Sequence, residues 1–375
     1  MKKIAIIFIV LVCIGSILSI LRWNEDVKHY PTEYCPDSDC KYSGLISNAI
    51  FHPNDENLNN LLPYMRTHYH AINPLSMTLL IIPNIFINNQ IISYFLLNLI
   101  FVILSIYFLG KILIKQIKVS KKEMYFILIL FISHLVVIRS FIRPGADSIL
   151  LFFVIASIYY TQEFITKSTK LSFFYLILLL TLGLFVKIAF IPMLGLPFLL
   201  FIFDKIKQHK TFFTKDVFYS ILLGIIPFVI WIGFIEIFSM WGAFYSAKTT
   251  LEYFSQNFGG GYKHLIEFLI VAFQIYIIFI LLNKKIFENK YIIHILWIVL
   301  YLGAIISQGH LYNRYALLII PSILILAYNG IVSIKKIYRW ILILSLIIIN
   351  YFIIIGQIMG LPWMGMPWHI LIYFY

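Results

Sequence analysis

The sequence predicts an all-α, polytopic transmembrane helical bundle of about eleven spans, and three observations lead to this fold class. Of the 375 residues, 61% are hydrophobic and only 12% are charged, whereas a soluble domain carries about a quarter charged residues. The mean hydropathy is +0.92, and apolar runs near the length of a spanning helix recur throughout the chain. The short alternating segments of a transmembrane barrel are absent from the sequence.

The predicted spans follow these apolar runs. The first run has the basic start of a signal peptide, but no small-residue cleavage site follows it, so we interpret it as an uncleaved first helix. Two prolines, Pro192 and Pro197, predict that the region 173–203 is a kinked or broken hairpin. The predicted spans are 4–21, 91–110, 123–140, 148–161, 173–187, 189–203, 217–236, 265–282, 291–306, 314–332 and 340–356.

One further apolar stretch, at 74–88, is only about half a span long. If it crossed the membrane, the loop 111–122 with its five lysines would lie outside the cell, against the tendency of basic loops to stay in the cytoplasm. We therefore expect an interfacial or re-entrant helix there.

The distribution of charge predicts the orientation in the cell membrane. The N-terminus and the alternate loops hold 19 of the 29 Lys and Arg residues but 5 of the 16 Asp and Glu residues, a net charge of +14. The remaining charges sum to −1. The basic face is therefore predicted to be cytoplasmic, together with the N-terminus. The same topology explains the overall charge of +13 without nucleic acid as a partner, because no basic groove with interleaved aromatic residues is present.

The chain is predicted to form a single membrane domain over residues 1–375, with a small extracytoplasmic cap built from two loops. The first loop, 22–72, is acidic and carries interfacial helices, and the second is 237–264. Cys35 and Cys40 lie close together in the first loop, where an oxidising compartment would favour a disulfide.

Acidic residues in the first loop are the first candidates for chemistry. Asp37 and Asp39 precede an amphipathic stretch, which would place a carboxylate near the start of a helix lying on the membrane. Each acid could instead be a helix cap or a solvated loop charge. We favour a functional interpretation for the cluster as a whole.

Cationic residues at predicted helix ends are the second group of candidates. Arg139, Arg143 and Asp147 fall at a membrane boundary, where arginines could bind a lipid phosphate or could reach the headgroups and pair with Asp147. Lys187 interrupts an apolar run and is either functional or an interfacial loop lysine. Arg314, close to Tyr312, could bind an anion together with Arg143, or could belong to an aromatic belt.

Histidines and glycines give weaker signals. Most of the histidines, including His70, fall on the predicted outer face, but their spacing does not match a metal site, so neither a metal nor another cofactor is predicted. The three glycines at 259–261 indicate a flexible turn rather than a phosphate-binding loop.

These motifs together resemble the layout of the GT-C-type integral membrane glycosyltransferases, which include protein mannosyltransferases and aminoarabinose transferases. The resemblance lies in five short stretches: DSDCKYSGLISNAIF at 37–51, INPLSMTLLIIP at 72–83, IRPGADSILLFF at 142–153, FVKIAFIPML at 185–194 and HLYNRYALLIIP at 310–321. The sequence departs from the family pattern in having Asp-Ser-Asp and Asn-Pro in place of the common Asp-Glu or Pro-Pro pairs.

The resemblance implies transfer of a sugar from a polyprenyl-phosphate carrier to a glycan, lipid or protein acceptor at the outer membrane face. In that mechanism Asp39, or Asp37, is the catalytic base, and Arg143, Lys187 and Arg314 hold the carrier phosphate. The wider set of candidate substrate-binding residues also contains Tyr312, Arg139, His70 and Asp147. Two alternatives stay open: a transporter or flippase for a lipid-linked or anionic solute, and a non-catalytic scaffold subunit.

Overall fold

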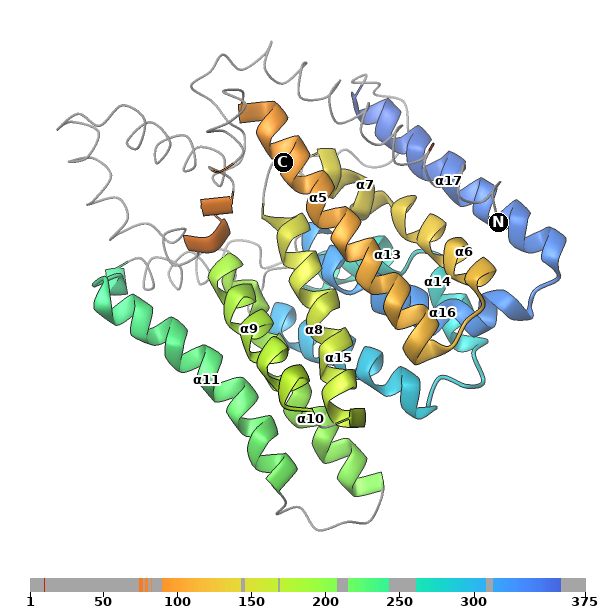
Figure 1. The fold of residues 1–375 in the computed structure, drawn as a ribbon. Helices are drawn as coiled ribbons and strands as arrows, with labels where there is room; N and C mark the ends of the chain where they lie inside the picture. Colours follow the sequence, from red (N-terminus) through yellow and green to blue (C-terminus); the bar gives the residue numbers. More distant parts are fainter. Residues whose placement is uncertain are drawn as a thin grey trace.

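The computed structural model describes most of the predicted helical region. The described residues are 10, 74–76, 78–79, 82, 90–142, 146–167, 169–207, 215–242, 261–307 and 313–358. Within these ranges the chain is helical and contains no strand, which confirms the all-α bundle (Figure 1). Both long predicted outer loops, 22–72 and 237–264, lie wholly or mostly outside this part of the chain.

The first half of the bundle runs from α5 to α11. It contains α5 (Gln90–Lys111), the π-helix η2 (Ile112–Ile117), α6 (Lys121–Ile132), α7 (Leu135–Ile142), α8 (Asp147–Lys167), α9 (Lys170–Val186), the 3₁₀ helix η3 (Ile188–Phe190), α10 (Ile191–Lys207) and α11 (Lys215–Ile237). The second half contains α13 (Gly261–Phe273), α14 (Tyr276–Leu281), α15 (Asn289–Ser307), the 3₁₀ helix η4 (Asn313–Leu318), α16 (Ile320–Ser333) and α17 (Lys336–Ile358).

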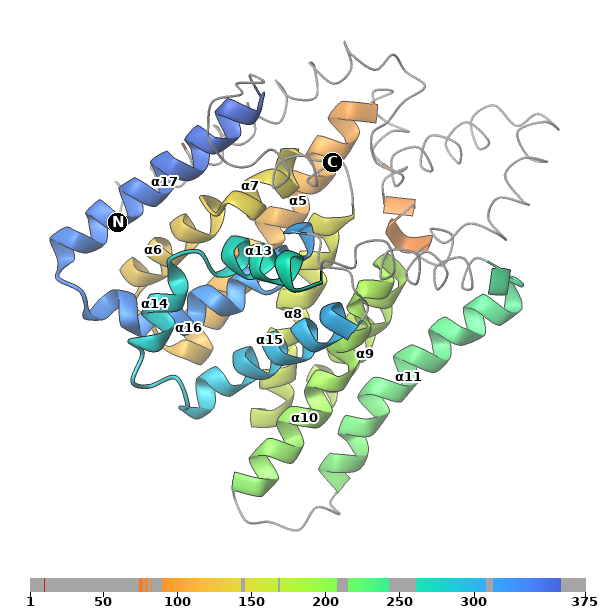
Figure 2. The same cartoon turned by 180° about the vertical axis from the view of Figure 1, so that it is seen from behind.

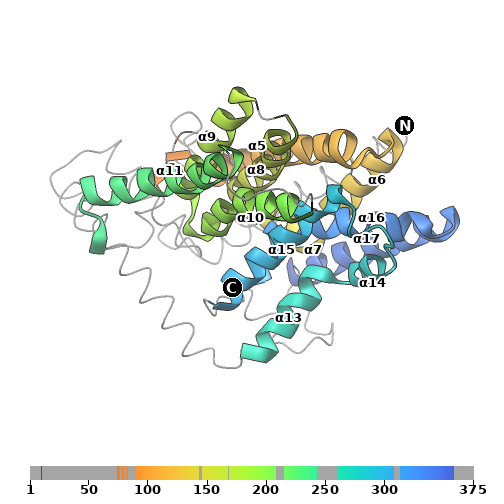
Figure 3. The same ribbon diagram turned by 90° about the horizontal axis from the view of Figure 1, so that it is seen from below.

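Two helices, α8 and α16, form the centre of the bundle, and most of their side chains are buried. α11 and α17 lie on opposite flanks in all three views (Figures 1, 2 and 3). The protein buries 67% of the apolar window of α8, but only 28% of that of α11 and 22% of that of α17. The flanking helices therefore present long apolar faces, as expected where lipid replaces protein as the neighbour.

Six described helices are long and apolar enough to cross a membrane. They are Phe95–Ile117, Asp147–Lys167, Ile188–Lys207, Val217–Ile237, Asn289–Ser307 and Lys336–Ile353. Two further apolar helices, α9 and α16, are shorter. These helices support a membrane protein, while the number of eleven spans stays a prediction, since span 4–21 lies almost wholly outside the described residues.

Two of the predicted spans are each divided into two helices. Span 123–140 is α6 and α7, which meet at Ser133 and His134, and span 265–282 is α13 and α14, which meet at Gln274 with φ 43°. At the first break, Asn350 of α17 donates a hydrogen bond of 2.8 Å to the Ser133 carbonyl. A backbone group freed by a break thus has a partner inside the protein, as a membrane interior requires.

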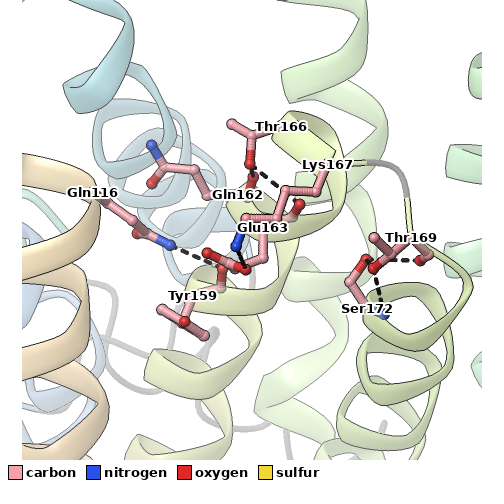
Figure 4. Close-up of polar contacts among 8 residues, drawn as sticks. All are labelled: Gln116, Tyr159, Gln162, Glu163, Thr166, Lys167, Thr169 and Ser172. Atoms are coloured by element: carbon pink, nitrogen blue, oxygen red, sulfur yellow. Dashed lines mark hydrogen bonds and ion pairs between the residues drawn. The ribbon is translucent and has the colours of Figure 1, made fainter.

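The starts of α6 and α9, which follow loops on the predicted cytoplasmic face, are capped by side chains. Ser120 and Glu123 form a reciprocal capping box at the start of α6. Thr169 accepts a hydrogen bond from the Ser172 amide at the start of α9, beside the Lys167–Glu163 ion pair that closes α8 (Figure 4). These contacts explain why α8 ends and α9 begins within a few residues of one another.

Candidate functional site

The described site is centred on an ion pair between two residues predicted from the sequence. Lys187 Nζ lies 2.8 Å from Asp147 Oδ1, although the two residues are 40 positions apart. Only 13% of the lysine side chain and 17% of the aspartate side chain are exposed. A pair this protected is screened far less than one on the surface, so each charge depends on the other.

The local backbone explains how both side chains reach this position. Lys187 ends α9 with an extended conformation, φ −164° and ψ 137°, before η3 begins. Asp147 occupies the first turn of α8, where a carboxylate also interacts favourably with the helix dipole. The pair therefore joins the end of α9 to the start of α8, two helices that pack along their length.

The turn at Lys187 is held in place by a close contact behind it. A Cβ atom at Gly183 would lie 2.4 Å from the Phe190 ring, and Phe190 is fully buried. Glycine at position 183 thus lets the aromatic ring fold back onto α9. This packing fixes the extended residue between α9 and η3, and with it the direction of the Lys187 side chain.

A third element, η4, completes the site. Lys187 Nζ lies 5.4 Å from the centroid of the Tyr315 ring, a cation–π distance. Tyr315 belongs to η4, which packs against α7, α8 and α13. The backbone of Arg314 directly precedes Tyr315 in this helix, and Arg139 lies on α7. Elements far apart in the sequence thus bring several of the predicted cationic positions to one region.

The described part of the chain places only some of the predicted residues. Lys187 and Asp147 are brought together, and the backbone positions of Arg139 and Arg314 lie on elements that pack next to them. The remaining predicted site residues, Asp37, Asp39, His70, Tyr312 and Arg143, lie outside the described residues, as do the side chains of Arg139 and Arg314.

Two features of the site were missed by the sequence interpretation. The sequence suggested arginine partners for Asp147 and did not predict its contact with Lys187. The arginine side chains lie outside the described part of the chain, so their pairing with Asp147 stays a prediction. Tyr315 was not among the predicted site residues, yet its ring lies next to the lysine. The available signal was the isolation of Lys187 in a long apolar run, since a protected charge needs an opposite charge nearby.

The described atoms of this arrangement form an ion pair beside an aromatic ring. An ammonium group has three donors, and Asp147 accepts one hydrogen bond from Lys187. Because the pair itself is neutral, an incoming phosphate would need further cations, which the positions of Arg139 and Arg314 could supply. No group of three His, Cys, Asp or Glu residues able to hold a metal occurs within the described ranges.

No protein-family model matches the sequence, and no curated protein gives a significant match to it. The similarity to GT-C-type glycosyltransferases therefore depends on the short motifs quoted above.

Proposed function

We propose that this protein is a membrane glycosyltransferase that moves a sugar from a polyprenyl-phosphate carrier to an acceptor. The observation that carries the proposal is the convergence of Asp147, Lys187 and η4, because three of the five motifs meet there. A lipid-linked donor needs no nucleotide-binding fold, and its prenyl chain would lie against apolar helices such as α11, which exposes Ile221, Ile225 and Phe228.

In the proposed reaction, Asp39 or Asp37 takes the proton from an acceptor hydroxyl. The acceptor oxygen then forms a bond to the anomeric carbon of the sugar, and the bond from that carbon to the phosphate oxygen breaks. The polyprenyl phosphate leaves with the electron pair. Lys187, with Arg143 and Arg314, would stabilise the charge that grows on the phosphate.

Asp147 has a distinct part in this proposal as a positioning residue. Its carboxylate holds the Lys187 ammonium in one place through the 2.8 Å contact. Without that contact the lysine could turn toward the membrane surface, because long basic side chains extend readily to the headgroups. The carboxylate would also compete with the phosphate for Lys187, which would help release of the product.

A second candidate function, a transporter or flippase for a lipid-linked or anionic solute, is supported by the broken helices. α7 and α13 pack together, and the ring of buried His134 at the α6–α7 break stacks on buried Tyr276 of α14, 5.9 Å between centroids. Discontinuous helices with polar groups at the break are common at transporter binding sites. A scaffold role without catalysis is the third possibility.

A transfer assay with purified protein tests the proposal. Polyprenyl-phosphate sugars carrying a radiolabel would be incubated with a panel of glycan, lipid and protein acceptors, and release of polyprenyl phosphate would be followed. We expect transfer by the unaltered protein and loss of turnover in Asp39→Asn, with donor binding retained, because Asn keeps the shape but accepts no proton. Arg143→Ala and Arg314→Ala should weaken binding and turnover together.

The matched control uses two lysines. Lys187→Met should reduce turnover by at least about a hundredfold, the size of losing one electrostatic contact to the transition state. Lys285→Met, whose lysine is 65% exposed in the segment between α14 and α15, should leave turnover unchanged. If no donor is cleaved with any acceptor, while the protein moves a lipid-linked solute across vesicles, the transporter replaces the transferase.

A further inference from the structure

A second concave site lies at the other end of the bundle, away from the Lys187–Asp147 pair. A partly open cavity of about 240 Å³ is lined by the starts of α6 and α17 and by the end of α16. Its polar lining comes from Ser120, Lys122, Glu123, Lys336 and Arg339, and Trp340 forms one wall. These elements belong to the basic face, which the charge distribution predicts to be cytoplasmic.

The electrostatic balance of this cavity is positive. Three cations, Lys122, Lys336 and Arg339, face a single carboxylate, that of Glu123. None of the ion pairs within the described ranges involves any of the three cations. The Nε atom of Arg339 is buried and lacks a hydrogen-bond partner among the described residues. A donor of this kind is costly to bury unless an acceptor occupies the space beside it.

The only carboxylate among the described residues that line the cavity already accepts hydrogen bonds from the protein itself. Glu123 accepts hydrogen bonds from the Ser120 amide at 3.0 Å and from the Ser120 hydroxyl at 2.8 Å. It also interacts with the Tyr328 hydroxyl. The acid therefore stabilises the start of α6 and also attracts Arg339, but one carboxylate leaves the cavity with a net positive charge for an external anion.

The surroundings indicate that this anion belongs to a lipid. The Trp340 indole packs edge-on against Phe126, 6.2 Å between centroids, and an aromatic ring beside basic residues is typical of the headgroup level of a bilayer. An apolar stripe then continues along α17 at helical spacing, in which each side chain is more than half exposed: Ile337, Ile341, Leu344 and Ile348. Acyl chains could lie along this stripe while a phosphate enters the cavity.

We propose that this cavity binds the phosphate headgroup of an anionic phospholipid. Lys336 and Arg339 would contact the phosphate oxygens, with Arg339 supplying the planar donor pair that matches them, and Lys122 would add charge from α6. Such a lipid would join α17 to α6 and α16, which pack against this weakly buried helix. The proposal is independent of glycosyl transfer, since it concerns the opposite end of the bundle.

Native mass spectrometry of the full chain in detergent tests this site with dioctanoyl phosphatidic acid as the probe. We expect one tightly bound phosphatidic acid, and weaker binding of dioctanoyl phosphatidylcholine. Lys336→Ala with Arg339→Gln should weaken phosphatidic acid binding by about tenfold or more, as expected for lost charge-assisted hydrogen bonds. The matched control is Lys335→Ala with Lys284→Ala, which also removes two positive charges, from side chains that do not line the cavity.

A variant that is expected to bind more tightly provides a test whose result cannot be explained by misfolding. Glu123→Gln keeps the capping box, since glutamine serves at that position, but removes the negative charge. It should bind phosphatidic acid several-fold more tightly. Equal losses in the two double variants, or no gain in Glu123→Gln, would overturn the proposal in favour of diffuse attraction to the basic face. Displacement of the lipid by inorganic phosphate at equal concentration would overturn the lipid assignment.

Discussion

Lys187 Nζ lies 2.8 Å from Asp147 Oδ1, and this contact ties the end of α9 to the start of α8. Because both side chains are largely buried, removal of one partner takes away a protected electrostatic contact of the other. Lys187→Met and Asp147→Leu should each lower the free energy of unfolding by about 2–4 kcal/mol. The double variant should recover part of this loss, which unfolding of the purified protein in detergent would measure. Strict additivity of the two losses would show that the residues do not interact.

A close helix contact gives the second prediction. A Cβ atom at Gly330 of α16 would lie 2.0 Å from the carbonyl oxygen of Phe279 of α14, so the two backbones would have to separate. Gly330→Ala should destabilise the protein by more than about 2 kcal/mol, as expected when a packed core is overfilled. Gly303→Ala is the control, since its Cβ would meet no atom within 4 Å. A higher helix propensity should make that variant as stable as the parent or more so. Thermal unfolding of both variants would test the pair.

The break between α6 and α7 gives the third prediction. Asn350 is buried, and its Nδ2 atom donates to the Ser133 carbonyl. Asn350→Leu removes this donor and should cost about 1–3 kcal/mol, the penalty for a buried group without its partner. Ile348→Ala, on the exposed side of the same helix, should change stability by less than about 0.5 kcal/mol. An Asn350→Leu variant as stable as the parent would mean that this bond does not support the break.

The orientation of the bundle gives the fourth prediction. In a variant without the native cysteines, single cysteines at Ser43 and Gln308 should react with a membrane-impermeant thiol reagent added to intact cells. A cysteine in place of Lys285 should react only after the membrane is opened. This orientation is expected because the net charge is +14 on one predicted face and −1 on the other. Reaction at only one of the first two positions would mean that an odd number of spans separates them.

The helices were predictable because their signal is local. Apolar runs near spanning length fixed the positions of α5, α8, α11, α15 and α17 to within a few residues for most of their ends, since membrane thickness sets how long such a run must be. The breaks inside spans 123–140 and 265–282 were not predicted. Neither break contains proline or glycine, so the sequence carried no ordinary helix-breaking signal there.

Among the candidate site residues, the sequence by itself indicated that Asp147 and Lys187 each need a partner, because a charge beside apolar helices is costly without one. Tertiary structure alone decided that these two residues pair with each other and that Tyr315 faces the lysine. The physical reason is that hydropathy reports how much of a helix avoids water, but not which face meets which neighbour. Which helix faces meet depends on close packing contacts, such as those of Gly183 with Phe190 and of Gly330 with Phe279. Such contacts leave no periodic pattern in the sequence.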